Sequence, residues 1–379
     1  MPGPITNCGT RAVHPPRVAH AGTEQLLDLA LSGLVAMFDP ESQLFCSRRW
    51  LGHTGLVNEG LSRRYTMISL LGLLQSEANG WPARLDHTAV LRGLLTDTRG
   101  LDNVGDLGLL LWLCALAHPK SIIDSSAVLN LRDVFKRYPD ARQGSTMELA
   151  WFLAGLAHRK LSRNACDESH TAFEVYTLLT ANQGPHGIFG HSATYGSVSG
   201  LLRGHIGSFA DQVYPIYALA KFAQAFGVPP ALEAARRCGE AICRMQGPSG
   251  QWWWHYDARR GRLLERYPVY SVHQDGMAPM ALFALGEATQ SDFRESIYKG
   301  LAWISGNNEL GRDLRDTSSG VIWRSIYRPA SWTQRCDEVR EFLRPCRSPE
   351  AIDDPKILFE CRPYHLGWLL YAFAGRACE

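Results

Sequence analysis

The segment Phe209–Gly227 reads FADQVYPIYALAKFAQAFG, and it decides the fold class. After a polar first turn, apolar residues of mixed size recur at helical spacing and cover nearly every side of the predicted helix. A helix of this kind is buried on most sides. The next segment, Ala231–Met245, is amphipathic, so it is expected to pack one face on the core and expose the other.

This pair of helices is one of six similar pairs along the chain. The segments that resemble the buried helix are Glu59–Leu74, Asn103–Ala117, Thr146–Ala157, Ala210–Ala225, Gln274–Ala288 and Tyr364–Ala374. The amphipathic segments alternate with them and are Thr23–Met37, Asp86–Thr96, Ser125–Arg137, Glu168–Ala181, Ala231–Met245 and Asp292–Ile304. Strict alternation predicts an all-α (α/α)6 barrel, a toroid of six helical hairpins with an inner and an outer ring. Little β-structure is expected, because period-two alternation is scarce.

We expect one domain over residues 1–379, with residues 1–22 as an extended N-terminal arm. Four long linkers, 38–58, 182–209, 246–273 and 305–358, each lead from an outer helix into an inner one. They therefore gather at the end of the ring where the inner helices begin. Long loops in compact domains are usually functional, and helix N-termini favour anions. The active site is expected at this end.

Composition excludes several classes of protein. The 379 residues carry a net charge of only +2 and no long basic block, so we expect no nucleic-acid partner. The longest apolar runs are too short for a membrane span, and no signal-peptide core is visible. The 10 cysteines are scattered without a CxxC pair, which favours free thiols and a cytoplasmic location. The sequence leaves the oligomeric state open.

Three residues at the starts of inner helices are the candidate acid/base groups. Asp211 opens one helix, and His273 and Asp275 occupy matched positions at the start of the next. Two carboxylates, or one with a histidine, can transfer protons to and from a substrate. The alternative is structural, because an aspartate at a helix start is often a cap.

Aromatic and polar residues near these starts are the candidate substrate contacts. Neither a helix nor a strand can bury all three tryptophans of QWWWHYD (251–257) on one face, so at least one should face the cleft or pack beneath the loops. The alternative is that they fill the barrel wall. The predicted contacts are Trp252, Trp253, Trp254, His255, Tyr256, Tyr214, Tyr270, Gln274, Arg203, Arg324 and His191.

Arginines also concentrate at the predicted mouth of the ring: Arg63, Arg64, Arg203, Arg266, Arg324, Arg328 and Arg362. A forked guanidinium suits a carboxylate, sulfate or phosphate. We expect several to neutralise Glu59, Glu265 or Glu360, and one or two to hold an anionic substrate.

Cofactor and metal chemistry is not expected. The sequence contains no Walker loop, no GxSxG elbow and no HExxH. Cys361 and His365 lie four residues apart, and Asp337 follows Cys336, but this spacing lacks the paired cysteines of a zinc site. A buried cysteine and a loop histidine are the simpler interpretation.

Two families of toroids resemble parts of this chain. The stretch Arg236–Trp252, RRCGEAICRMQGPSGQW, resembles the QW repeat of terpenoid cyclases and prenyltransferase β subunits, and KGLAWI (Lys299–Ile304) echoes its start. The DxDD motif of class II cyclases is missing. The same region is similar to the six-hairpin glycosidases, above all the unsaturated uronyl hydrolases, over about 80 residues. That resemblance implies Asp211 as general acid/base, whereas the family's second acidic position is not clearly placed.

The leading hypothesis is therefore a carbohydrate-active enzyme that acts on an acidic or anionic glycan by acid/base catalysis, as a hydrolase, lyase or epimerase. Its partner would be a small molecule or an oligosaccharide. The alternatives are an isoprenoid cyclase or prenyl-transfer enzyme, and a non-catalytic glycan- or peptide-binding toroid.

Overall fold

The computed structural model describes residues 21–82, 84–97, 101, 103–117, 144–162, 169–192, 203–329 and 354–376. Most of the predicted N-terminal arm and the predicted outer helix Ser125–Arg137 lie outside these residues. The first described helix begins at Ala21.

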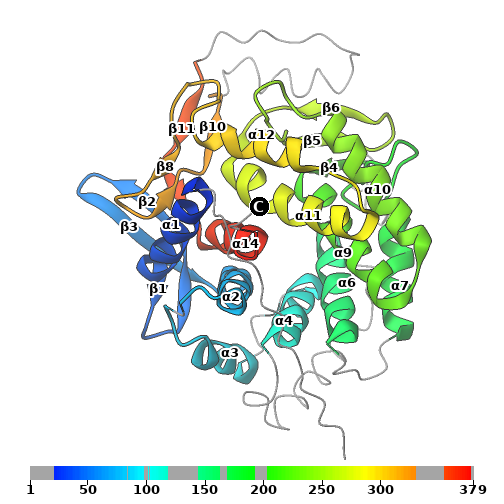
Figure 1. The fold of residues 1–379 in the computed structure, drawn as a ribbon, viewed down its shortest axis with the longest axis horizontal. Helices are drawn as coiled ribbons and strands as arrows, with labels where there is room; N and C mark the ends of the chain where they lie inside the picture. The colour runs from blue at the N-terminus through cyan, green and yellow to red at the C-terminus, as the bar shows by residue number, and fades with distance from the viewer. Residues whose placement is uncertain are drawn as a thin grey trace, which may run out of the picture.

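Six buried helices form the inner ring, as predicted (Figure 1). They are α2 (Arg63–Ala78), α4 (Val104–Leu116), α6 (Thr146–Leu161), α9 (Ala210–Phe226), α11 (Ala278–Thr289) and α14 (Pro363–Phe373). Each packs on the next, and α14 returns to α2, which closes the ring. A short π-helix, η2 (His273–Met277), leads into α11.

Outer helices cover this ring within the described residues. They are α1 (Ala21–Met37), α3 (His87–Thr96), α7 (Ser169–Thr180), α10 (Pro229–Arg244) and α12 (Arg294–Ile304). In α10 the apolar stripe that includes Ala231, Ala235, Cys238 and Ile242 is buried, while the charged face is in water. No described helix is both long enough and apolar enough to cross a lipid bilayer.

Inner helices approach one another closely where glycines face each other. A Cβ atom on Gly72 of α2 would lie 2.1 Å from the carbonyl oxygen of Gly367 on α14. A Cβ atom on Gly155 of α6 would lie 2.3 Å from the carbonyl oxygen of Gly108 on α4. Real Cβ atoms do not sit at such distances, so the absence of a side chain is required for this packing.

The linkers contain more β-structure than the sequence predicted. The strands are β1 (Phe38–Asp39), β2 (Leu44–Gly52), β3 (Gly55–Ser62), β4 (Ile206–Ser208), β5 (His255–Asp257), β6 (Arg262–Glu265), β7 (Val269–Tyr270), β8 (Arg315–Asp316), β9 (Val321–Ile322), β10 (Ser325–Tyr327), β11 (Lys356–Leu358) and β12 (Glu360–Cys361). They form small antiparallel sheets: β12 and β3 flank β2, β10 lies between β11 and β7, β5 lies between β4 and β6, and β8 pairs with β9. Most strands are too short to show a periodic pattern.

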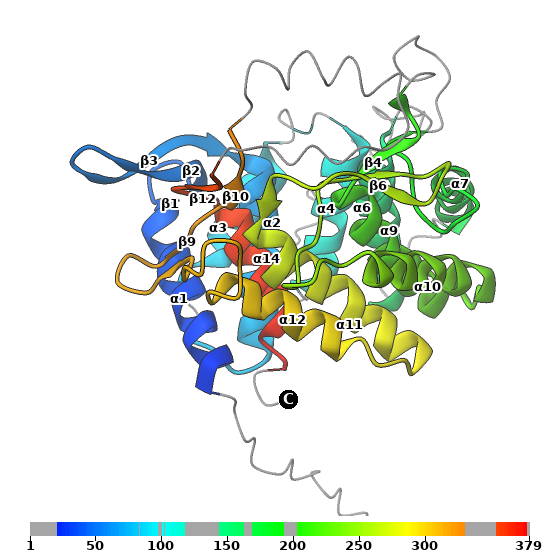
Figure 2. The same cartoon turned by 90° about the horizontal axis from the view of Figure 1, so that it is seen from above.

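The strands gather at the end of the ring where the inner helices begin, which we call the mouth (Figure 2). Each long linker runs from an outer helix to an inner one, as predicted. The start of α2 differs from the prediction of Glu59, because the chain stays extended against β2 until Ser62 caps the helix through its hydroxyl. The cysteines within the described residues, Cys46, Cys114, Cys238, Cys243 and Cys361, are free thiols.

Candidate functional site

A cavity of about 690 Å³ opens at the mouth between the starts of α2, α4 and α14. Its lining is Ser47, Arg48, Glu59, Gly60, Leu61, Ser62, Arg63, Arg64, Tyr65, Asp106 and Arg362. Four arginines therefore face two carboxylates. The first turn of α2 contains no acidic residue, so its free N–H groups add to the positive potential. The cavity suits an anionic ligand.

Asp106 is the carboxylate at the inner wall of this cavity. It lies in the first turn of α4, where the Asn103 side chain caps the helix by accepting from Asp106 N. The side chain is almost fully buried, and Arg64 donates from Nε to Oδ1 (2.6 Å) and from Nη2 to Oδ2 (2.9 Å). This two-pronged contact fixes the carboxylate with respect to α2.

Glu148 lies beside Asp106, in the first turn of the neighbouring helix α6. It forms a capping box in which its Oε2 accepts from Ser145 N (2.7 Å). The helices meet here because Gly105 has no side chain, since a Cβ atom would lie 2.9 Å from the Glu148 Cα. Two carboxylates thus stand at the same level of adjacent inner helices. Glu148 is half-buried, and its Oε1 has no described donor.

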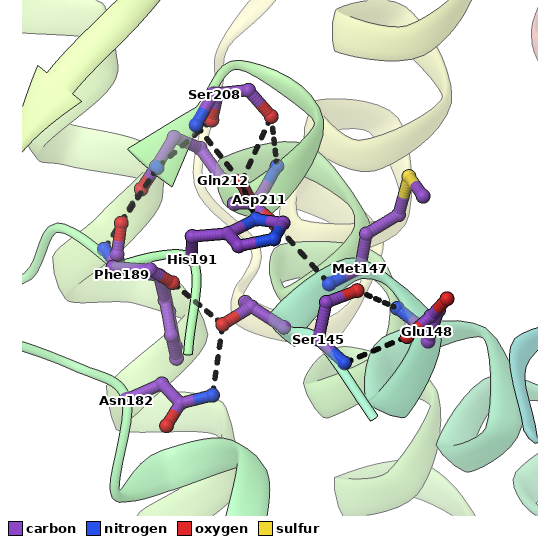
Figure 3. Close-up of polar contacts among 11 residues, drawn as sticks. Ser145, Met147, Glu148, Asn182, Phe189, His191, Ser208, Asp211 and Gln212 are labelled. Atoms are coloured by element: carbon purple, nitrogen blue, oxygen red, sulfur yellow. Dashed lines mark hydrogen bonds and ion pairs between the residues drawn. The ribbon is translucent and has the colours of Figure 1, made fainter. Parts of the chain in front are cut away.

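Asp211 occupies the start of α9 but points toward α6 rather than into open space (Figure 3). Its Oδ1 accepts from Met147 N (3.2 Å). Its Oδ2 accepts from Ser208 N (2.9 Å), Ser208 Oγ (2.9 Å) and His191 Nδ1 (3.2 Å). Asp211 is 1% exposed, and these four hydrogen bonds tie it to His191, to the loop before α9 and to the start of α6. These bonds allow Asp211 to position His191 and the start of α6, and the expectation that Asp211 itself exchanges a proton with substrate stays a prediction.

His191 is the exposed partner of this buried aspartate. Its side chain is 58% exposed, and the hydrogen bond that it donates to Asp211 raises the pKa of the imidazole, against the opposing effect of partial burial. The charges of Asp211 and Glu148 act in the same direction. A buried carboxylate that orients an exposed imidazole is suited to hold a polar ligand group at the mouth.

Matched glutamines explain why several predicted substrate contacts are buried. Gln212 accepts from Phe189 N (2.8 Å) and donates to Phe189 O (2.9 Å), whereas Gln274 accepts from Trp252 N (3.2 Å). Each glutamine ties the preceding loop to its inner helix. The predicted contacts that the structure buries, at 6% exposure or less, are Trp252, Trp253, Tyr256, Tyr214 and Gln274. These side chains form the wall of the barrel, so they are corrected to packing residues.

Other predicted contacts keep an exposed face. Trp254 is half-buried. The centroid of its ring lies 4.9 Å from that of Tyr270 and 6.0 Å from that of His273, on which it stacks. Arg324 lies over the Tyr270 ring at 5.1 Å. Of the three consecutive tryptophans, Trp252 and Trp253 are buried and Trp254 is the most exposed. His255 is half-buried and bonded to Glu265, and Arg203 is exposed.

His273 and Asp275 lie within η2 and are both buried. Burial lowers the pKa of His273 to about 3, so its imidazole is neutral. Asp275 accepts from His365 Nε2 at 2.7 and 2.9 Å. Burial lowers the pKa of His365, but the charge and hydrogen bond of Asp275 outweigh it and raise the pKa to about 9. Asp275 thus bonds toward α14, whereas Asp211 bonds toward α6, so the structure does not join them in one acid/base set.

The lumen below the mouth is filled by aromatic side chains. Tyr217 Oη lies 2.7 Å from both Tyr371 Oη and His158 Nε2, and Trp112 Nε1 donates to Tyr371 Oη (3.3 Å). Burial lowers the pKa of His158 to about 3, so this network is uncharged. It closes the barrel beneath the site.

The described residues contain no cluster of three histidine, cysteine or acidic side chains placed to hold a metal ion. Cys336 and Asp337, considered above as zinc ligands, lie outside the described residues.

Sequence reasoning did not single out Asp106, Glu148 or Arg48. A signal for Asp106 was present, because it is the only charged residue of α4. Arg324 and Arg362 contact Glu360, as the sequence predicted for the arginines at the mouth. The other two acidic residues have partners that were not predicted, because Glu59 pairs with Arg48 and Glu265 with His255.

Comparison with solved structures finds the same fold across nearly the whole chain. A possible member of the GH105 family from Klebsiella pneumoniae subsp. pneumoniae MGH 78578 superposes with a TM-score of 0.65 at 11% identity, covering 99% of each chain. An unsaturated glucuronyl hydrolase from Streptococcus agalactiae gives 0.63 at 10% identity, over 95% of this chain and 93% of that one. The unsaturated glucuronyl hydrolase of Bacillus sp. GL1, described as responsible for the degradation of glycosaminoglycan, gives 0.56 at 15% identity, over 93% and 94%. No protein-family model and no curated protein matches the sequence. The likeness establishes the α/α-toroid fold.

Proposed function

We propose that this protein is a glycoside hydrolase that acts on an oligosaccharide bearing an acidic sugar. One observation carries the proposal: two carboxylates, Asp106 and Glu148, stand in the first turns of adjacent inner helices beside a cavity lined by four arginines. Paired carboxylates are the usual catalytic groups of glycosidases. The unsaturated glucuronyl hydrolases that share this fold support the choice of hydrolysis over elimination or epimerisation.

The two carboxylates differ in their surroundings, and this difference assigns their roles. Both oxygens of Asp106 face Arg64, so this group is held in place to orient a water molecule or a sugar hydroxyl. Glu148 engages only Oε2, with Ser145 N, and in the proposal its other oxygen donates the proton to the substrate. His191, held by Asp211, contacts the sugar from the α9 side.

The alternatives fit the site less well. A carbocation route through an isoprenoid chain needs an apolar cavity, whereas this cavity is lined mainly by charged and polar side chains. A non-catalytic binding toroid predicts arginines and aromatic rings without adjacent carboxylates. Asp106 and Glu148 stand on neighbouring helices, which favours the enzyme.

The test is an assay of the hydrolysis of unsaturated glucuronyl disaccharides. The reaction is monitored through the loss of the absorbance of the substrate's double bond. Asp106→Asn and Glu148→Gln should each lower kcat by roughly 10²–10⁴-fold, as expected for loss of an acid/base group. Glu295→Gln, an exposed change on outer helix α12, is the matched control and should leave kcat unchanged. Full activity of both site variants would exclude this assignment.

A further inference from the structure

Glu360 is a nearly buried carboxylate at the mouth that contacts three guanidinium groups. It lies on β12, which pairs with β2, and its side chain is 7% exposed. Its Oε1 accepts from Arg324 Nη1 and from Arg362 Nε, both at 2.6 Å. Its Oε2 accepts from Arg48 Nη1 at 3.5 Å. One buried negative charge therefore gathers three positive ones.

Each of the three guanidinium groups also lies over an aromatic ring. Arg324 lies over Tyr270 at 5.1 Å, Arg362 over Tyr65 at 5.8 Å, and Arg48 over Trp50 at 5.9 Å. A guanidinium group that is stacked on a ring keeps the N–H groups in its plane available for hydrogen bonds. The arginines are thus held before any ligand arrives, which reduces the entropy lost on binding.

Positive charge remains in surplus within this cluster. The exposed Glu59 accepts two bonds from Arg48 Nη2, both at 2.8 Å, so two carboxylates face three guanidinium groups. Arg362 donates to Glu360 and, from Nη1, to Tyr65 Oη (2.8 Å), which leaves Nη2 without a described acceptor. Arg48 and Arg362 both line the 690 Å³ cavity. An oxyanion there would neutralise the surplus and satisfy the remaining donors.

We propose that Arg48 and Arg362, held by Glu360 and supported by Arg324, form the subsite that binds the oxyanion of the acidic sugar. This inference rests on the proposed function and names the residues that would make the enzyme select an acidic over a neutral sugar. A carboxylate and a sulfate ester share the required chemistry. The residues of this subsite belong to the linkers before α2 and α14. The two candidate catalytic carboxylates belong to different elements, α4 and α6.

The test measures binding without turnover. Ligand-observed NMR titrations with glucuronate, glucose 6-sulfate and glucose are run on the full chain and on Arg362→Gln, Arg48→Gln and Arg315→Gln. Arg315 pairs with Asp313 on another linker and is the matched control. We expect Arg362→Gln and Arg48→Gln to weaken binding of the favoured anion by roughly ten- to a hundredfold, with glucose binding and the Arg315→Gln variant unchanged.

The outcomes separate this inference from the proposed function. If Arg362→Gln fails to fold, Arg48→Gln decides the question, because the Arg48 side chain is 41% exposed. A preference for glucuronate or for glucose 6-sulfate identifies the oxyanion and supports the subsite in either case. Equal loss for anion and glucose, or anion binding that is unchanged in both variants, would overturn it. Arginine-dependent anion binding without hydrolysis would uphold the subsite and reject the hydrolase.

Discussion

Asp211→Asn tests whether the aspartate at the start of α9 positions the site or performs the chemistry. The carboxylate accepts four hydrogen bonds, three of them at Oδ2. An asparagine side chain retains one oxygen, and the least costly orientation places it where Oδ2 lies. The amide nitrogen then faces Met147 N–H, donor against donor. Loss of one charge-assisted bond should lower the free energy of unfolding by about 2–3 kcal/mol.

Activity should fall for an indirect reason. Met147 precedes Glu148, and His191 loses the charge that orients its ring, so both shift when Asp211 is neutralised. We expect kcat to fall by roughly ten- to a hundredfold, less than for loss of an acid/base group itself. The assay pairs urea unfolding, followed by circular dichroism, with initial rates on the unsaturated disaccharide.

A second buried aspartate provides the control. Asp257 is 2% exposed and accepts from Arg259 N and Arg260 N in a turn outside the cavity. Asp257→Asn should lose stability by a similar amount and keep its activity. The reasoning would be refuted if Asp211→Asn were as stable as the native chain yet inactive, because Asp211 would then act on the substrate directly.

Three further outcomes are expected. Gly72→Ala places a Cβ atom 2.1 Å from Gly367 O and should destabilise the protein by about 3 kcal/mol or more in urea unfolding, whereas Gly93→Ala, which meets no atom within 4 Å, should not. The folded-state pKa of His365, about 9, lies above its value in the unfolded chain, so its contribution to stability is complete below about pH 6.5 and is lost as pH rises through 9. The stability difference between the native chain and His365→Gln should therefore shrink from pH 7 to pH 10, and a constant difference would contradict the assignment. Trp254→Ala should raise KM by about tenfold with little change in kcat if its exposed ring stacks on the sugar, which steady-state kinetics will show.

The helices could be predicted from sequence because the distribution of apolar residues around each helix indicates how much of it is buried. In α4 apolar residues surround the whole helix, and in α10 they form one stripe, so inner and outer positions differ at a glance. The strands could not be predicted in this way. Most of β3 is exposed, and what holds it extended is pairing with β2 rather than an alternating pattern. The same pairing explains why α2 begins at Arg63.

The arginine subsite lay beyond sequence reasoning for a related cause. Arg48 and Glu360 are 312 residues apart, and they meet only because β12 pairs with β2. Arg324 reaches the same carboxylate from a third linker. Composition indicated that arginines would gather at the mouth and that some would neutralise Glu360. The closure of the ring determines which linkers meet, and local sequence patterns do not indicate such long-range contacts.

Matched positions in a repeat protein indicate the scaffold more reliably than the chemistry. Gln212 and Gln274 recur at the starts of neighbouring inner helices because each ties down the loop before it, and Asp211 and His273 precede them in the same register. A residue that recurs at one level of the ring performs the same task in each hairpin. A single substrate site has to break that symmetry. Asp106 differs from these residues because it lines the cavity and is the one charge in an otherwise apolar helix, so it is the stronger candidate for catalysis.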